Sequence, residues 1–581
     1  MSVLIVTNLQ KITIFTQILA KNRLKRMHRV TLRLINTSTN IEVEMGATLM
    51  DVLRSLDISM PYPALVARVN NSFKSLGYRI FKPVTVEVLD VRSFEGYRVY
   101  QRTLSFVMQR ASLELFPERK LRIRHTLGNG FYAEYDDHVV PTAEDVVRLR
   151  ERMEALIALD IPITRQKRLA EEVAAQYEAY GFDDRLELLK TRPRLYRTVN
   201  YLGDMPGYFY GELAPSTAYV ERFDIKQYYN GLYVALPSRT NPEEVTTTIN
   251  HDKMFDIFHE YQQWIDIMGV PTVGDLNRRV MNGEASELIQ IAEVFHENKI
   301  ASIARAIADA NAERGVRLAL ISGPSSSGKT TFSKRLGVQL KVLGLDPVLI
   351  ALDDYFVDRD KTPLGEDGKP DFEALEAIDL DTLNSHLKAL ANGESVEIPR
   401  YDFISGKRQW HEKPLKLSDR SILIMEGIHA LNPKLTPGIS AGEKFKIYIS
   451  CFTSVAMDNF SRIPTTDNRL LRRMIRDNAT RGNNALRTLA MWGSVRRGEE
   501  KHIFPYQENA DVMFNSSLFY EISVLKAVAE PLLREVSDTE PEYAEARRML
   551  RFLDNFTPIQ PDEIPPTSLL REFIGGSSFN Y

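Results

Sequence analysis

The sequence feature that most constrains this chain is the run Gly323–Thr330, which reads Gly-Pro-Ser-Ser-Ser-Gly-Lys-Thr. It matches the P-loop pattern of a glycine, four residues and then Gly-Lys-Ser/Thr. A short apolar run, Val316–Ile321, precedes it, and Thr331–Leu343 follows with apolar residues at helical spacing. A strand, a loop and a helix are therefore expected in that order, which is the context that this pattern needs in order to bind phosphate.

Nucleotide binding follows from the physics of such a loop. Consecutive backbone N–H groups point into it, and the N-terminus of the following helix adds partial positive charge. Lys329 is expected to reach the β- and γ-phosphates, and the Thr330 hydroxyl is expected to bind Mg²⁺. We predict ATP or GTP binding, with ATP and Mg²⁺ as the cofactors; the alternative is a glycine-rich turn in a fold that has lost its nucleotide. The residues predicted to hold ATP are Gly323, Ser325, Ser326, Ser327, Gly328, Lys329, Thr330 and Thr331.

The length, charge and cysteine count of the chain limit the class of protein to which it can belong. A chain of 581 residues suggests about three or four domains. Lys plus Arg number 74 and Asp plus Glu 77, so the net charge of −3 argues against bulk nucleic-acid binding, although a local basic groove stays open. The single cysteine, Cys451, excludes an intramolecular disulfide and a cysteine-rich zinc site. No apolar run has the length of a membrane span. We therefore predict a cytoplasmic protein without a membrane partner, and leave its oligomeric state open.

The first residues form an unusual extension. Residues 3–20 are fairly apolar, and basic residues follow from Lys21 on, which reverses the order of a secretory signal. We interpret residues 1–28 as a disordered or helical extension, or as a start assigned too early with Met27 as the true first residue.

The next segment, 29–91, predicts a small domain of strands around one helix. Val30–Ile35 and Ile41–Met45 alternate apolar and polar residues, a capped turn leads into a helix, and 64–69 and 84–91 add two strands. This β-grasp order resembles the TGS domain found at the start of threonyl-tRNA synthetases and of stringent-response enzymes.

Residues 92–240 continue the resemblance to threonyl-tRNA synthetase. The amphipathic stretch 100–116 and the segments after it look like the second additional, editing domain of that enzyme. In that family an HxxxH pair and a later Cys-x-x-x-His pair build the editing site. This chain has Arg102 and Phe106 at the first pair and Glu212–Ser216 at the second. Because a hydrolytic site needs metal ligands or a base, we predict an α+β editing-type fold that has lost its chemistry, and leave a new binding role and a structural role open.

Residues 241–314 predict a helical connector. Apolar residues recur at three- and four-residue spacing over 243–268 and 284–312, and Pro271 and Gly274 separate these two stretches.

Two acidic residues follow apolar strands in the segment 315–525, where strands and helices alternate as in a parallel α/β sheet. Asp353 comes after Pro347–Leu352, and Glu426 comes after Ser421–Met425. Ligands of such sheets bind at the carboxyl ends of the strands. Asp353 can accept the proton of an attacking hydroxyl or hold Mg²⁺ through water, and Glu426 has a Walker-B-like position that meets the metal. The alternative for either residue alone is a loop cap.

After the P-loop, five segments give residues 316–520 a resemblance to the uridine kinase/phosphoribulokinase family. In family order they are Asp353–Phe356, Phe372–Glu373, Pro399–Phe403, Met425–Gly427 and the arginine-rich run from Arg469 to Arg481. The resemblance implies a P-loop kinase with a parallel sheet, in which Asp353 is the general base. It also implies that Glu373 stands where the family has the aspartate that holds the ribose hydroxyls. The residues so predicted to bind the acceptor are Phe372, Glu373, Tyr401 and Phe403.

The arginine-rich run suits phosphoryl transfer. Charge spreads over the transferred oxygens, and guanidinium groups stabilise it while they exclude water. The spacing places Arg469, Arg473 and Arg476 on one helix face; the alternative is a solvated basic face. The residues predicted to act in catalysis are Asp353, Lys329, Arg473, Arg476 and Arg481.

Three positions depart from the family where it reads a pyrimidine. Gly406, Asn483 and Met491 stand in place of its histidine, arginine and glutamine. A site built to hydrogen-bond a base edge leaves polar groups unpaired when a partner is lost, so we expect another acceptor or a base that is held differently. Glu373 still offers a carboxylate to a ribose-like diol, and a nucleoside-like small molecule is the predicted acceptor.

Three interpretations of function follow. The first is an ATP-dependent kinase that phosphorylates a hydroxyl of a nucleoside. The second is a regulatory or RNA-linked binding protein with the P-loop unit as a nucleotide-driven switch; the synthetase-like half favours it, and the retained Asp353 and Glu426 oppose it. The third is a phosphoribulokinase-like sugar-phosphate kinase, in which Arg496 and Arg497 contact an acceptor phosphate. Residues 526–581 form a tail, for which we predict one helix after Pro531, at 542–554, and an apolar end that docks back on the fold.

Overall fold

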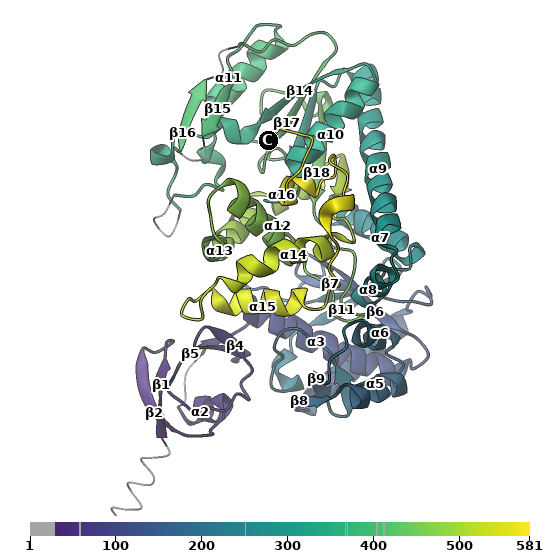
Figure 1. Cartoon of the computed structure of the whole chain (residues 1–581), viewed down its shortest axis with the longest axis vertical. Coiled ribbons are helices and arrows are strands. Elements are labelled where there is room, and N and C mark those ends of the chain that lie inside the picture. The colour runs from purple at the N-terminus through teal and green to yellow at the C-terminus, as the bar shows by residue number, and fades with distance from the viewer. Residues whose placement is uncertain are drawn as a thin grey trace, which may run out of the picture.

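The computed structural model describes residues 29–56, 60–249, 251–365, 368, 370–402, 405–410 and 413–580. The predicted extension 1–28, with Met27, and the predicted acceptor residue Phe403 lie outside the described residues. The chain is a mixed α/β protein of several units, as predicted. Figure 1 shows the two N-terminal units at one end, a parallel sheet at the other, and the C-terminal helices between them. In the part of the chain that the structure describes, no helix has both the length and the apolarity that crossing a bilayer requires.

The first unit is a five-stranded sheet with one helix. Its elements are β1 (Arg29–Leu34), β2 (Thr39–Glu44), α2 (Leu49–Ser55), β3 (Val66–Val69), β4 (Ser72–Lys74) and β5 (Val84–Leu89), and the strand order is β2-β1-β5-β3-β4. β1 pairs with β5 in parallel, and the other neighbours are antiparallel. The predicted capped turn is confirmed, because the Thr48 hydroxyl accepts the N–H of Asp51 and the Asp51 carboxylate accepts the N–H of Thr48. β4 was not predicted, since three residues are too few to show an alternating pattern.

The second unit contains two antiparallel sheets packed against long helices. Its elements are α3 (Phe94–Leu115), β6 (Leu121–Leu127), β7 (Gly130–Tyr135), α4 (Ala143–Ala158), β8 (Ile163–Leu169), α5 (Ala170–Ala179), α6 (Asp183–Thr191), β9 (Tyr196–Leu202), β10 (Met205–Gly207), η1 (Thr217–Val220), β11 (Asp224–Tyr228) and β12 (Gly231–Ala235). The strand orders are β11-β12-β7-β6 and β10-β9-β8. α3 begins before the predicted residue 100, because the Ser93 side chain accepts the N–H of Gly96 and so caps the helix there.

The connector contains three helices, α7 (Asp252–Ile267), α8 (Val273–Met281) and α9 (Ala285–Arg314). The prediction of a helix from residue 243 is wrong, because Val245 forms an isolated bridge with Pro237 and the helix begins only at Asp252. The separator around Gly274 is itself helical, since the Thr272 side chain accepts the N–H of Asp275 and caps α8. α9 is capped by Gly315, whose φ of +69° is the left-handed C-cap conformation that favours glycine.

A parallel five-stranded sheet forms the core of the third unit. Its strands are β13 (Leu318–Ser322), β14 (Asp346–Ala351), β17 (Ser421–Glu426), β18 (Lys444–Ser450) and β19 (Val512–Asn515), in the order β14-β17-β13-β18-β19. Around it lie α10 (Lys329–Val342), η2 (Leu352–Tyr355), η3 (Arg359–Lys361), η4 (Leu375–Ala377), α11 (Leu380–Ala391), the hairpin β15 (Pro399–Asp402) and β16 (Lys407–Trp410), η5 (Ala441–Glu443), α12 (Thr465–Thr480), α13 (Ala485–His502) and η6 (Phe504–Asn509). Ile321 and Ile424 pack with α9 and α10, whereas Leu320 and Met425 pack with α7 and α11. Both faces of the parallel sheet are thus covered, which explains why its strands are continuously apolar.

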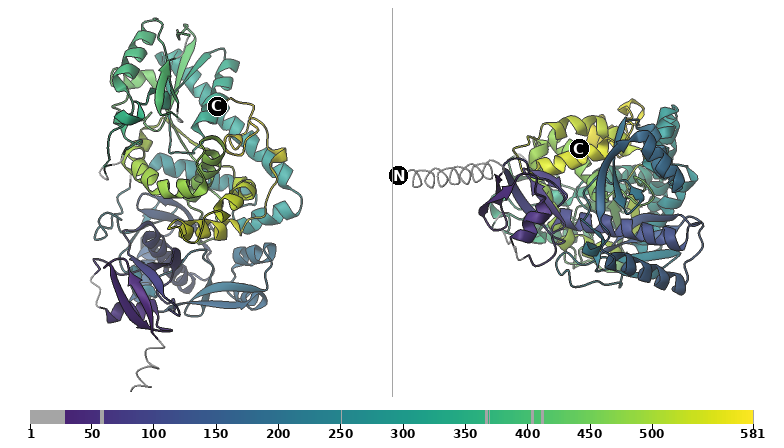
Figure 2. Two further views of the ribbon diagram at one scale, coloured as in Figure 1. Left: turned by 60° about the vertical axis from the view of Figure 1, so that its left-hand side comes forward. Right: turned by 90° about the horizontal axis from the view of Figure 1, so that it is seen from below.

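The tail contains more helix than predicted. Its elements are α14 (Glu521–Arg534), α15 (Tyr543–Leu553), η7 (Pro561–Glu563) and α16 (Arg571–Ile574). α14 crosses the predicted boundary at residue 525 and contains Pro531, which removes one backbone hydrogen bond. The helix persists because its apolar face, with Leu525 and Ala529, packs into the core shared with α12 and α15. The left view in Figure 2 shows these yellow helices between the sheet of the third unit and the N-terminal units, and Asn71 of the first unit donates to the Asp538 carbonyl at 3.1 Å.

Candidate active site

The P-loop joins β13 to α10 and is shaped by its backbone. A Cβ at Gly323 would lie 2.0 Å from the Ile449 carbonyl oxygen, so only glycine fits beside β18. Ser326 has a φ of +60° and Gly328 a φ of +84°, the left-handed conformations that turn the loop back on itself. The Lys329 ammonium donates to the carbonyl of Gly323 at 3.0 Å and therefore lies over the loop. These contacts fix the shape of the loop. They also hold the Lys329 ammonium over the loop, where it could contact a bound phosphate.

Two hydroxyl groups of the loop have no partner among the described residues. They belong to Ser326 and Ser327, and both side chains are buried. A buried hydroxyl without a hydrogen bond is costly, and a phosphate oxygen would satisfy it. This observation fits a nucleotide over the loop.

The metal-binding pair of the prediction is in contact. The Thr330 hydroxyl donates to Glu426 Oε1 at 2.9 Å. Ala351 at the end of β14 lies opposite Glu426 at the end of β17, which brings Asp353 to the same edge of the sheet. Burial raises the pKa of Glu426 to about 7, the negative charge of Asp353 adds to this, and Lys329 opposes it. A divalent cation would relieve the crowding of carboxylates, so the donor set fits Mg²⁺.

The three predicted catalytic arginines converge on one carboxylate. Arg473 Nε lies 3.2 Å from Asp477, Arg476 Nη2 2.8 Å from it, and Arg481 Nε 4.0 Å from it. Arg473 also donates to the Ser325 hydroxyl of the P-loop at 2.7 Å. Burial lowers the pKa of Arg481 to about 10, and the neighbouring charge of Arg476 acts in the same direction. Asp477 therefore holds these arginines beside the loop, a role that the sequence did not reveal.

A second link between the arginine helix α12 and the P-loop runs through Glu499 of α13. Arg469 is ion-paired with Glu499 and donates to the Ser325 carbonyl at 3.0 Å. Glu499 in turn accepts the Ser325 N–H at 3.2 Å. The sequence placed Arg469 on the helix face but missed Glu499, whose only signal was an acidic residue inside a basic cluster.

Glu373, one of the predicted acceptor residues, lies against α13. A Cβ at Gly498 would lie 2.5 Å from Glu373 Cβ, so the two backbones approach closely there. Burial raises the pKa of Glu373 to about 7; Arg473 and Lys329 oppose this shift, and Asp353 adds to it. Phe372 is 40% exposed. Tyr401 on β15 packs edge-on against Phe356 with ring centroids 5.6 Å apart.

The structure shows the surroundings of the three positions that depart from the pyrimidine-reading pattern. Gly406 has a φ of +70°, and a Cβ there would lie 2.7 Å from the guanidinium carbon of Arg359. The Asn483 N–H donates to the Asp477 carbonyl at 3.1 Å, and Met491 is 40% exposed. A histidine at position 406 would collide with Arg359, so this acceptor side is built differently.

The C-terminal tail docks on the P-loop. Glu572 of α16 accepts the Thr331 N–H at 3.1 Å and the Thr331 hydroxyl at 2.6 Å. Leu569 is buried, and a Cβ at Gly328 would lie 3.4 Å from it. The predicted return of the apolar end to the fold is confirmed, and its contact with the first turn of α10 is new.

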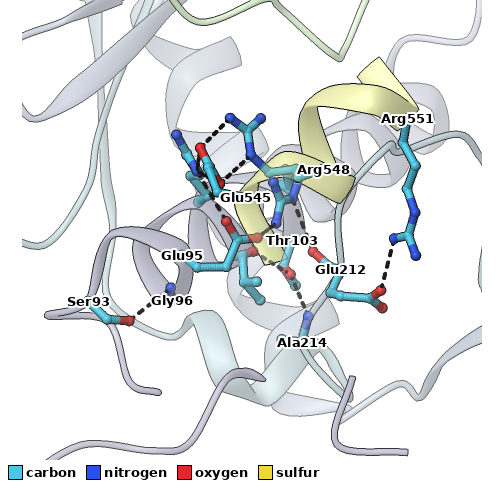
Figure 3. A network of polar contacts seen from close by, with 12 residues as sticks. Ser93, Glu95, Gly96, Thr103, Glu212, Ala214, Glu545, Arg548 and Arg551 are labelled. Atoms are coloured by element: carbon cyan, nitrogen blue, oxygen red, sulfur yellow. Dashed lines mark hydrogen bonds and ion pairs between the residues drawn. The ribbon is translucent and has the colours of Figure 1, made fainter. Parts of the chain in front are cut away.

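Two of the four positions compared with the synthetase editing site, Arg102 and Glu212, form ion pairs. Arg102 on α3 donates to the Glu212 carbonyl at 3.0 Å, and the Glu212 carboxylate lies 2.7 Å from Arg165 and 3.8 Å from Arg551. We refer to these four residues as the Glu212 cluster; Figure 3 shows Glu212 facing Arg551 of α15. Phe106 is buried in the core. Within the described ranges no group of three or more His, Cys, Asp or Glu side chains could hold a metal ion.

Comparisons with known proteins divide the chain into two parts. The model of the phosphoribulokinase / uridine kinase family matches residues 319–522. A uridine kinase of Staphylococcus aureus (strain JH9) is 30% identical over 194 residues, which cover 33% of this chain and 84% of that kinase. A threonine–tRNA ligase of Symbiobacterium thermophilum is 29% identical over 185 residues, which cover 32% of this chain and 28% of the ligase. A solved structure described as a possible uridine kinase from Bacillus stearothermophilus is 21% identical, with a TM-score of 0.24, and covers 34% of this chain and 89% of that one. The chain thus spans little more than a quarter of the ligase.

Proposed function

The chain belongs to the phosphoribulokinase/uridine kinase family, and from this premise we propose that it is an ATP-dependent kinase that transfers the γ-phosphate to a hydroxyl of a nucleoside-like acceptor. One observation carries the proposal. The charges of Asp353 and Lys329 both act on the pKa of Glu426, on the metal side, and on the pKa of Glu373, on the acceptor side. The groups required for phosphoryl transfer therefore share one electrostatic site at the carboxyl edge of the sheet.

Each residue of this site has a task in the proposed reaction. The P-loop amides and Lys329 hold the phosphates of ATP. Thr330 and Glu426 would hold Mg²⁺, which when bound neutralises charge on the phosphate oxygens. Asp353 accepts the proton of the acceptor hydroxyl as the oxygen attacks the γ-phosphorus, and the bond to the β-phosphate oxygen breaks. Arg473, with the other arginines held by Asp477, stabilises the charge on the transferred group and excludes water.

The acceptor side favours a ribose-bearing molecule over a sugar phosphate. The Glu373 carboxylate can accept hydrogen bonds from two neighbouring hydroxyl groups. A phosphorylated acceptor would need a cation there. Of the two candidates for it, Arg496 lies on the far side of α13, where it stacks on Phe94 at 4.6 Å, and Arg497 has an exposed position. The position of Arg496 therefore weakens the case for a sugar-phosphate kinase.

The decisive test is Asp353→Asn in the full-length chain, assayed for ATP-dependent phosphorylation of a nucleoside and pentose panel. Loss of the general base should lower turnover by roughly 10²–10⁴-fold. Asp354→Asn is the matched control, because its Oδ1 accepts the Tyr401 N–H at 3.2 Å and an amide keeps that oxygen. Near wild-type turnover in the Asp353 variant would remove the assigned base, and the absence of turnover by the wild type on every acceptor would remove the kinase proposal.

A further inference from the structure

A large cavity lies between the second unit and the third unit. Its volume is about 660 Å³, and its walls come from α3, β6, the segment 238–240, α7, the end of β18, the segment 453–466 and α13. Among the described residues, no P-loop residue and none of the predicted acceptor residues Phe372, Glu373 and Tyr401 lines it. Arg469 alone among the arginines named above is shared, because it lines the cavity and also donates to Ser325. The cavity has the size of a small-molecule site, and Arg469 links it to the active site.

The positive charge of the cavity exceeds its negative charge. Arg239 and Arg496 share a single carboxylate, Glu500, at 3.3 and 3.4 Å. Arg462 has no carboxylate partner among the described residues, and its Nη2 lies 3.5 Å from the side-chain oxygen of Gln101. Its Nε is buried without a partner in the described part of the chain. The three guanidinium groups of Arg239, Arg462 and Arg496 are therefore balanced by the single carboxylate of Glu500.

Other arginines of the same wall are compensated, so the excess is local. Arg98 and Arg548 both pair with Asp467 and Glu545, and Figure 3 shows Glu545 beside Arg548. By contrast, burial lowers the pKa of Arg462 and lowers that of Arg496 to about 10. Buried charges without partners are costly, and an anion in the cavity would relieve that cost.

The same cavity offers aromatic surfaces beside the arginines. Arg239 and Arg496 both contact Phe94, with their guanidinium carbons 3.7 and 4.6 Å from its ring centre. His125 is 3% exposed, lines the cavity and has no hydrogen-bond partner for either ring nitrogen among the described residues. Its ring is stacked on Phe258 at 4.2 Å, which fixes its orientation. A ligand with its own hydrogen-bond donors and acceptors would satisfy these nitrogens.

We propose that this cavity, which we call the arginine cavity, binds a mononucleotide, with its phosphate on Arg239, Arg462 and Arg496 and its base beside Phe94 and His125. Arginine forks match phosphate oxygens in geometry and charge. A bare anion would leave the His125 nitrogens unpartnered, and a bare nucleoside would leave the guanidinium groups uncompensated. The combination of the two defines the ligand class.

Binding should be tested on the full-length chain carrying Lys329→Ala, which weakens the P-loop site. The probes are the 5′-monophosphates of adenosine, guanosine, cytidine and uridine, the matching nucleosides, and inorganic phosphate, measured by titration calorimetry. We expect one monophosphate to bind at one site per chain, at least about 10-fold more tightly than its nucleoside and than phosphate, since charge-assisted hydrogen bonds to guanidinium groups are stronger than neutral ones. Binding of none of the monophosphates, or equal binding of phosphate alone, overturns the proposal.

Variants locate the site. Arg462→Gln and Arg496→Gln should each weaken the monophosphate at least about 10-fold, whereas Arg487→Gln, at an exposed position of α13, should leave it unchanged. Affinity that is insensitive to the first two variants overturns the assignment. A tRNA transcript that binds in an Arg462-dependent way, while no monophosphate binds, would make the cavity an RNA site and the mononucleotide proposal wrong.

A stability measurement separates binding from a structural role. Without ligand, Arg462→Gln removes an uncompensated charge, so its melting temperature should equal or exceed that of the parent. A structural arginine would show the opposite, a fall. Addition of the bound monophosphate should raise the melting temperature of the parent and not that of the variant. A lower melting temperature of the ligand-free variant, or equal stabilisation of both proteins, contradicts the proposal.

Discussion

The P-loop site and the Glu212 cluster lie in the two halves of one chain, and their charges are arranged in opposite ways. In the P-loop site the hydroxyls of Ser326 and Ser327 have no partner in the described part of the chain, and the pKa values of Glu373 and Glu426 are raised to about 7. In the Glu212 cluster the buried carboxylate is paired with arginines of β8 and α15. A site that binds a ligand keeps groups whose requirements only the ligand meets. A site that has become structural satisfies its groups internally.

The largest expected effect is that of removing the Lys329 ammonium, which is proposed to hold the phosphates of ATP. Lys329→Ala should lower the rate of phosphoryl transfer by roughly 10²–10³-fold, because a preorganised donor to the developing charge is lost. The rate should be measured in single turnovers with saturating acceptor. The matched control is Lys341→Ala in the last turn of α10, where the side chain is exposed. If the rate of the Lys329 variant were within a few-fold of the wild-type rate, the P-loop site would have a structural role, as the Glu212 cluster does.

A smaller effect is expected at Glu373. Glu373→Gln should lower kcat/KM for the acceptor by about 10- to 100-fold, because hydrogen bonds to a charged group contribute ~1.5–3 kcal/mol. In the wild type, kcat/KM should rise with pH up to about 7, as the carboxyl group with its raised pKa ionises. The variant should lose this rise, and Glu376→Gln, an acid at an exposed position nearby, should keep it.

The same raised pKa makes a stability prediction of defined sign. The folded protein holds the Glu373 proton more tightly than the unfolded chain, whose pKa is near 4.5. This contribution to stability is complete below pH 4.5 and is lost as the pH rises to about 7. The difference in melting temperature between wild type and Glu373→Gln should therefore change over this window. A constant difference would show that the carboxyl is not held in its protonated form.

The local parts of the active site could be predicted from the sequence. The strand before the P-loop and the helix after it lie within two or three residues of their predicted positions, because apolar periodicity and glycine spacing are local properties. The same holds for Asp353 and Glu426, which follow apolar strands. The contact of Glu499 with Ser325 joins positions 174 residues apart, and no periodic pattern reports such a pair.

The parts that sequence reasoning missed all depend on docking between units. The arginine cavity combines Phe94 of α3 with Arg496 of α13, and each residue alone is an ordinary aromatic or basic residue on a helix. Glu212 was recognised as a departure from the editing pattern, but its partner Arg551 comes from the tail. The tail itself was predicted with too little helix, because Pro531 suggested a break that packing of α14 overrides.

The smallest expected effect tests the structural side of the comparison. Glu212→Gln should destabilise the protein by about 1–2 kcal/mol, since it weakens charge-assisted hydrogen bonds to a group that is 5% exposed. Its kcat should stay within about twofold of wild type, because no reacting group lies at the cluster. Denaturant unfolding and steady-state kinetics on the same preparations measure both quantities.

Glu221→Gln is the control for this last variant, because the Glu221 side chain is 67% exposed and its 3.7 Å pair with Arg222 is at the surface. Its effect on unfolding should be under about 0.5 kcal/mol. If Glu212→Gln lowered kcat strongly while leaving stability unchanged, the cluster would act on the reaction, and the contrast between the two sites would fail. If it lowered stability alone, the ion pairs of the Glu212 cluster would have a structural role, in contrast to the charged groups of the P-loop site.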